Sequence, residues 1–171
     1  MSTTDKTSAE LLAAQALASQ VKKELTENIL PYWINKMCKP EGGFYGQING
    51  SEELVADAPV GNIMTARVLW TFASAYRLLG NQEYLEMALR AKKLLLEKFV
   101  DPEFGGTYWS INADGTPLDT KKQIYAIAFS IYGLSELNRA TGDAEALEYA
   151  IKLFRSIEDH SFDNEKDGYF E

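Results

Sequence analysis

The feature that most constrains the fold of this chain is an internal repeat of 62 or 63 residues. Three short glycine-containing segments resemble one another, at 41–46, 103–109 and 164–171. Helical landmarks recur with the same period, because Gly80 and Leu85 match Gly142 and Leu147, each 62 positions later. Such self-similarity is typical of architectures in which each unit buries its apolar face against its neighbours.

Each unit has the same expected content. A Gly-Gly turn leads into a short β-hairpin, exemplified by 107–118 with its turn at 112–115, and an apolar inner helix and an amphipathic outer helix follow. We expect inner helices at 61–79 and 120–140, outer helices at 83–99 and 144–160, and an N-terminal outer helix at 8–37. Gly80 and Gly142 are typical helix ends, and Pro31 predicts a kink or break.

Alternating inner and outer helices predict an all-α fold, an incomplete (α/α)6 toroid of antiparallel helical hairpins with short β-hairpin loops. We expect residues 1–171 to form a single domain of about two and a half hairpin repeats, with 1–7 as a flexible N-terminus. A closed ring of this kind needs about six hairpins. We therefore expect either that the chain is a fragment or a split-gene product, or that another chain completes the ring.

Composition excludes several classes of protein. The net charge is −8 and the 17 basic residues are dispersed, which argues against nucleic acid and against an anionic membrane surface. No stretch reaches the roughly 18 apolar residues of a membrane span, and the N-terminus has no signal-peptide pattern. The single cysteine, Cys38, allows neither an internal disulfide nor a cysteine metal cluster. We expect a cytoplasmic protein without metal or other cofactor.

One charged residue stands inside the first inner helix. Apolar side chains cover nearly the whole circumference of 61–79, which predicts a buried helix, yet Arg67 lies within it. Burying an unpaired charge is very costly, so Arg67 must meet a carboxylate, a water-filled cavity or a ligand. Thr71 and Ser74 continue a narrow polar stripe from it. Two hypotheses stay open: the wall of a binding site, or a structural ion pair.

Three segments, 66–80, 101–110 and 119–129, resemble the N-acylglucosamine 2-epimerase superfamily, and within it the cellobiose 2-epimerase group. The resemblance runs from about residue 28 to 171 and covers less than half of a typical member. It implies an (α/α)6 barrel that inverts C2 of a reducing-end sugar. Members of the family abstract the C2 proton next to the aldehyde, pass through an enediolate and reprotonate the opposite face.

The resemblance also implies roles for individual residues. The family arginine that stabilises the developing oxyanion falls on Arg67, and a tyrosine near the substrate falls on Tyr125. Gln123, at the mouth of the same helix, is a further candidate for substrate binding. Phe129 and Tyr132 continue an aromatic stripe from Tyr125 at helical spacing, and we expect them to fill the core.

The chain departs from the family pattern in two respects. The two histidines that serve as acid and base lie in later repeats of the family, and the only histidine here, His160, is expected to be a solvated residue at the end of an outer helix. Thr65 stands at a position where asparagine is more usual in this family. We therefore expect the chain to be inactive by itself. Lys121 and Lys122 are expected to form a solvated pair in a loop.

Two alternatives from other classes stay open. One is half of a toroidal glycoside hydrolase or lyase, in which Asp57, Asp101 and Asp119 would supply paired carboxylates, although turn and cap roles are expected for them. The other is a helical-repeat module that binds carbohydrate without turnover. The expected partners are a mono- or disaccharide and either a second copy or another chain, because exposed inner-helix surface promotes association.

Overall fold

The computed structural model describes residues 3–171, with side chains from residue 9 onward. The chain divides into two compact units, Met1–Cys38 and Lys39–Glu171. Of the expected flexible segment 1–7, residues 1 and 2 lie outside the described residues, and the first helix begins at Thr3.

The first unit is a run of consecutive helical segments. They are α1 (Thr3–Glu24), η1 (Leu25–Ile29), α2 (Leu30–Tyr32) and η2 (Trp33–Met37), of which η1 and η2 are π-helical. Pro31 lies in the first turn of α2 and has no N–H to donate, but the chain stays helical on both sides of it. Of the predicted kink or break at Pro31, the break is wrong, because wider π turns flank the proline and keep the segment helical.

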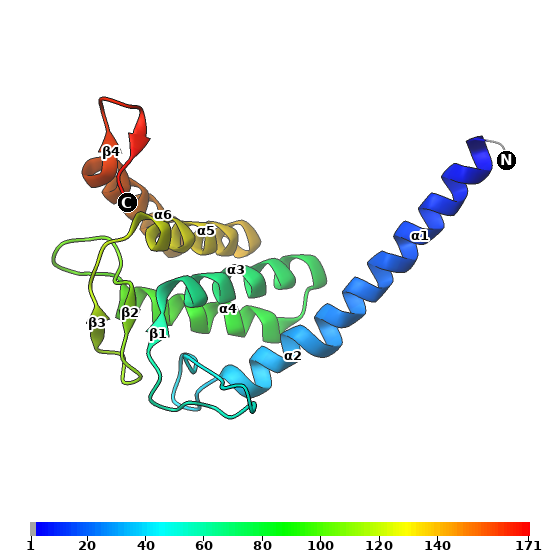
Figure 1. Cartoon of the computed structure of the whole chain (residues 1–171), viewed down its shortest axis with the longest axis horizontal. Helices are drawn as coiled ribbons and strands as arrows, with labels where there is room; N and C mark the ends of the chain where they lie inside the picture. Colours follow the sequence, from blue (N-terminus) through cyan, green and yellow to red (C-terminus); the bar gives the residue numbers. More distant parts are fainter. Residues whose placement is uncertain (1–2) are drawn as a thin grey trace. The chain divides into compact units, whose positions relative to one another are not determined.

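The second unit consists of two helical hairpins. The helices are α3 (Asn62–Leu79), α4 (Gln82–Leu94) with its π-helical continuation η3 (Leu95–Phe99), α5 (Ile124–Thr141) and α6 (Ala144–Ser161). The inner helices α3 and α5 pack on each other, and each also packs on the outer helix that follows it (Figure 1). This arrangement confirms the predicted alternation of inner and outer helices.

The predicted helix ends are confirmed by the backbone. Gly80 and Gly142 adopt the left-handed conformation, with φ of 72° and 76°, and close α3 and α5. The next residues cap the outer helices: the side chain of Asn81 accepts a hydrogen bond from the Glu83 amide, and that of Asp143 from the Ala146 amide.

The inner helices run parallel and very close together. The Ser130 hydroxyl donates to Asn62 Oδ1 at 3.0 Å near the start of α3, and the Arg77 guanidinium meets Glu136 at 2.8 Å near its end. Between these contacts, a Cβ added to Gly133 would lie 2.7 Å from the carbonyl oxygen of Ala66. A glycine is therefore what permits this approach, which places the exposed edges of α3 and α5 side by side.

Short strands lie at the N-terminal end of the inner helices. They are β1 (Val60–Gly61), β2 (Ser110–Ile111) and β3 (Pro117–Asp119), in one antiparallel sheet of order β1-β2-β3, and the separate pair β4 (Phe162–Asp163) and β5 (Gly168–Tyr169). The hairpin predicted at 107–118 is confirmed, with its turn closed by a bond from the Asn112 amide to the Thr116 carbonyl. Strand β1, from the preceding repeat, adds the third strand.

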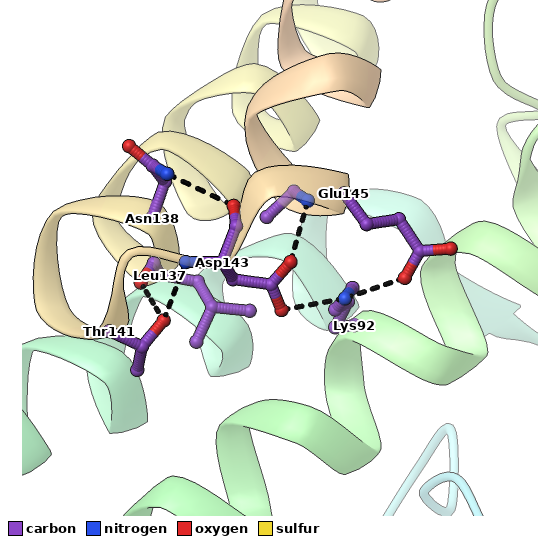
Figure 2. A network of polar contacts seen from close by, with 7 residues as sticks. Lys92, Leu137, Asn138, Thr141, Asp143 and Glu145 are labelled. Atoms are coloured by element: carbon purple, nitrogen blue, oxygen red, sulfur yellow. Dashed lines mark hydrogen bonds and ion pairs between the residues drawn. The ribbon is translucent and has the colours of Figure 1, made fainter.

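The outer helix α4 is joined to the start of α6 by a charged network (Figure 2). Lys92 Nζ lies 2.6 Å from Asp143 Oδ2 and 2.7 Å from Glu145 Oε2. Burial by itself would lower the pKa of Lys92, but the hydrogen bonds and charges of the two carboxylates outweigh it and raise that pKa. Asp143 therefore both pairs with Lys92 through Oδ2 and caps α6 through Oδ1.

Within residues 3–171, no helix is both long and apolar enough to cross a membrane.

Candidate functional site

Arg67 lies on the second turn of α3 with its side chain exposed. It forms no hydrogen bond or ion pair with the side chains that the structure describes, so the structural ion-pair hypothesis finds no support there. The prediction that α3 is buried on all sides is wrong at Arg67. Helix α3 packs its other faces against α4 and α5 and leaves a stripe around Arg67 open to solvent. Neighbouring Thr65 is fully buried and donates to the Gly61 carbonyl at 3.1 Å, within its own helix.

A row of four aromatic rings, which we call the aromatic row, connects α3 with α5. Trp70, one turn beyond Arg67, stacks on Tyr132 with ring centroids 5.0 Å apart and planes 10° from parallel. Phe129 then contacts Tyr132 at 6.3 Å and Tyr125 at 5.0 Å, both edge to face. The row therefore leads from the helix of Arg67 to the first turn of α5.

The row is open to solvent. Tyr125 is 54% exposed and Tyr132 47%, while Phe129 and Trp70 are half-buried. The expectation that Tyr132 fills the core is wrong, because its ring stacks on Trp70 at the solvent-facing edge between α3 and α5. Arg67 and Tyr125 thus lie on neighbouring parallel helices, connected through the aromatic row.

Gln123 is the N-cap residue of α5 and is half-buried. Its side chain makes no capping hydrogen bond, and its carbonyl accepts from the Ile127 amide at 3.1 Å. The helix begins at Ile124, four residues later than predicted, because Asp119 Oδ1 binds the Lys121 amide and holds 120–123 outside the helix. Gln123 therefore lies at the mouth of α5, one turn or less from Tyr125.

Sequence reasoning missed a charged cluster beside Gln123. Lys122 forms an ion pair with the buried Asp101, and its ammonium lies 4.2 Å from the ring centroid of Tyr108. The expectation of a solvated Lys122 is therefore wrong, whereas Lys121 is exposed. The only signal in the sequence is the repeat itself, because the position of Lys122 is that of Val60 in the preceding unit.

The electrostatics of Asp101 follow from its contacts. Burial would raise the pKa of Asp101, but hydrogen bonds from Lys122 and from the Phe104 and Glu103 amides outweigh it and hold the pKa at about 2. Burial also raises the pKa of Tyr108, and the adjacent Asp101 charge and hydrogen bond add to this effect. Near neutral pH the cluster therefore carries an ionised Asp101 carboxylate, paired with Lys122, beside a neutral Tyr108 phenol.

The remaining candidates lie apart from Arg67 or have local roles. His160 is exposed on the outer helix α6, with Nδ1 2.9 Å from the Ser156 carbonyl of the same helix, so its solvated placement is confirmed. Asp57 is exposed, Asp119 closes the turn before α5, and Asp101 is paired with Lys122. Asp101 and Asp119 are thus each bound by neighbouring groups, as expected for turn and cap residues.

The two helical hairpins, with their inner helices packed on each other, make this a helical-hairpin repeat protein of the α/α-toroid type. Residues 43–171 match the model of the N-acylglucosamine 2-epimerase (GlcNAc 2-epimerase) family, which is about three quarters of the chain. The chain belongs to this family.

Several curated proteins named cellobiose 2-epimerase are similar to this chain. The chain is 61% identical over 158 residues to a cellobiose 2-epimerase of Bacteroides fragilis, covering 92% of this chain and 40% of that protein. It is 43% identical over 147 residues to a cellobiose 2-epimerase of Ruminococcus albus, covering 86% of this chain and 38% of that protein. The chain therefore spans about 40% of the length of the relatives that it matches.

Solved structures confirm the fold class. A cellobiose 2-epimerase from Bacillus thermoamylovorans aligns with a TM-score of 0.88 at 37% identity, covering 91% of this chain and 40% of that one. A D-mannose isomerase aligns at 0.76 and 24% identity, and a family 76 α-mannanase from Bacteroides thetaiotaomicron at 0.70 and 18%. The last two share the fold alone.

Proposed function

We propose that the chain supplies one wall of a sugar 2-epimerase, which inverts C2 of a reducing-end sugar such as cellobiose or an N-acylglucosamine. The observation that carries the proposal is Arg67, an exposed cation without an ion-pair partner among the described side chains, on an inner helix of an epimerase-family chain. The identity of 61% to a protein named cellobiose 2-epimerase supports the disaccharide.

Arg67 has the chemistry that this reaction needs. Removing the proton at C2 of an open-chain aldose moves negative charge onto the carbonyl oxygen, and a fixed cation nearby stabilises the transition state as that charge grows. A guanidinium suits the role, because it stays charged at every relevant pH and donates several hydrogen bonds in one plane. An arginine already neutralised by a carboxylate would be less effective, and Arg67 has no such partner among the side chains described from residue 9 onward.

Tyr125 and Gln123 would contact the sugar itself. The exposed ring of Tyr125 offers an apolar face for the C–H groups of a pyranose, with a hydroxyl at its edge. The amide of Gln123, at the mouth of α5, can both donate and accept toward sugar hydroxyls. In this proposal Arg67 acts on the reacting oxygen, and Gln123 and Tyr125 hold the substrate.

The acid and the base must come from elsewhere. Among the described residues the one histidine is His160, which lies on α6 and binds its own helix. We therefore propose that the chain has no epimerase activity alone, and that further repeats, supplied by another segment or by a partner chain, complete both the barrel and the proton-transfer pair. A homodimer of this chain would add a second Arg67 wall but no histidine at that face.

The proposal is tested by measuring epimerisation of cellobiose to the C2 epimer by NMR. Three samples are compared: this chain, a polypeptide with the part of the Bacteroides fragilis relative that the chain does not cover, and the two mixed. We expect turnover only in the mixture, and its loss in the mixture when Arg67→Ala replaces the wild-type chain. Robust turnover by this chain alone would contradict the assignment of the acid and base to other repeats.

The same samples separate the alternative classes. A non-catalytic carbohydrate module would show cellobiose-induced shifts in the chain but no turnover in the mixture. A hydrolase would release new reducing ends from an oligosaccharide. No observation favours the hydrolase, because Asp101 is held in an ion pair with Lys122 and Asp119 accepts from the Lys121 amide.

A further inference from the structure

The two inner helices are anchored at their N-terminal ends in different ways. The start of α3 is held by a sheet, since Val60 pairs with Ile111 and Gly61 with Ser110. The amide of Asn62, the first residue of α3, donates to the Trp109 carbonyl at 3.0 Å. Backbone bonds therefore fix the helix that carries Arg67.

The start of α5 has no such sheet. The positions one repeat after Val60 and Gly61 are Lys122 and Gln123, and 120–123 belong to neither a helix nor a strand in the described structure. The loop follows the edge strand β3 and enters α5 through Gln123. What replaces the missing strand pairing is the side chain of Lys122.

Lys122 is held from three sides. Its ammonium pairs with Asp101 Oδ2, while Asp101 Oδ1 is fixed by the amides of Glu103 at 2.9 Å and Phe104 at 3.1 Å. The ammonium also lies over the Tyr108 ring, and its stem crosses Gly106, where an added Cβ would come within 3.2 Å of Lys122 Cδ. The Asp101 side chain is only 7% exposed against 30% for Lys122, so the carboxylate end of the ion pair is shielded from competing ions.

We propose that Lys122 is a positioning residue for the sugar site: its ion pair with Asp101, in place of a strand, sets the loop 120–123 and thereby the placement of Gln123 and Tyr125 relative to Arg67. The part that concerns sugar rests on the proposed function. The part that concerns placement does not, because it can be measured in the free chain without sugar.

The experiment compares three variants of the full chain. Lys122→Met removes the charge and keeps the apolar stem, and Lys122→Arg keeps the charge. Lys92→Met is the matched control, because the Lys92 side chain is only 12% exposed and also pairs with carboxylates, those of Asp143 and Glu145, but joins α4 to α6. The readouts are the NMR signals of the Tyr125 ring and the Gln123 side-chain amide, together with the melting temperature.

We expect Lys122→Met to shift or broaden the Tyr125 and Gln123 signals, and Lys122→Arg to restore them. Lys92→Met should lower the melting temperature without moving these signals. If Lys122→Met melts lower but leaves both signals in place, Lys122 is merely stabilising and the proposal is overturned. If Lys122→Met fails to fold, Lys122→Arg and the milder Asp101→Asn test the proposal in its place. Unchanged Tyr125 and Gln123 signals in Asp101→Asn would also overturn the proposal.

A cellobiose titration of the same samples separates the placement of Gln123 and Tyr125 from sugar binding. We expect Lys122→Met to raise the Kd for cellobiose, obtained from the shifts, roughly three- to tenfold. This is the change expected for loss of about one hydrogen bond. If wild-type chain shows no cellobiose-induced shifts, sugar binding by this wall fails while the signals of the free chain still test the placement.

Discussion

At the scale of single residues, Arg67 and Asp101 illustrate opposite uses of charge. Arg67 is exposed and lacks an ion-pair partner among the described side chains, whereas Asp101 is buried and fully bonded. The free charge is available for chemistry, and the bonded charge stabilises the fold. Each makes a different prediction for stability.

We expect Arg67→Ala to change the free energy of unfolding by less than about 0.5 kcal/mol, because exposed side chains without specific contacts contribute little. The same substitution should abolish activity in the reconstituted mixture. Chemical denaturation of the 171-residue chain checks the first statement. A large destabilisation would mean that Arg67 has a structural role, contrary to its exposure.

The Asp101 carboxylate makes stability depend on pH. Its pKa is about 2 in the folded state against an ordinary 3.8, so the folded state favours the charged form. The contribution is about 2 kcal/mol, is fully present above about pH 4, and is lost as the pH falls toward 2.

Asp101→Asn should therefore be less stable than wild type at pH 7, and the difference should shrink as the pH falls from 4 to 2. Denaturation midpoints across this range check the sign. A difference that stays constant with pH would show that Asp101 is not a carboxylate held ionised by Lys122.

At the scale of helices and strands, the close contact of α3 with α5 depends on Gly133. We expect Gly133→Ala to destabilise the chain by roughly 1–3 kcal/mol, because the new methyl group meets backbone that cannot move aside without separating the helices. Gly61→Ala is the matched control, since nothing lies within 4 Å of a Cβ there. Equal melting temperatures for the two variants would contradict the tight parallel contact.

Sequence reasoning located most elements because their ends have local chemistry. Gly80 and Gly142 mark helix ends through their left-handed backbone, and the start of α3 was predicted within one residue. The start of α5 was missed because the Asp119 side chain competes with the helix for the Lys121 amide. Strand β1 was missed because its partner, β2, lies about fifty residues away and each has two residues.

The candidate site was predictable to a lesser degree. Arg67 was identifiable because one charge in an apolar helix needs an explanation, but its exposure depends on which faces the neighbouring helices cover. The pairing of Lys122 with Asp101 joins residues 21 positions apart across a hairpin, and no local pattern encodes it. The roles of Tyr125 and Gln123 stay predictions.

At the scale of the whole molecule, the second unit exposes apolar side chains on both α5 and α6. They include Tyr125, Tyr132, Leu147, Ile151 and Phe154, each more than 40% exposed. Contiguous exposed apolar surface promotes association.

We therefore expect concentration-dependent self-association of the isolated chain, measured by sedimentation velocity at low and high concentration. Addition of the complementary polypeptide should suppress it, because the same surface would then be covered. A clean monomer at high concentration would contradict this expectation.

The pairing of β1 with β2 also bears on how the chain is made. Val60 and Gly61 leave the ribosome about fifty residues before Ile111 and Ser110, with which they form their sheet. At bacterial and eukaryotic synthesis rates this delay lasts about 3–10 s. During that interval the entrance to α3 has no strand partner, so the Arg67 wall takes its final form only when the second repeat emerges.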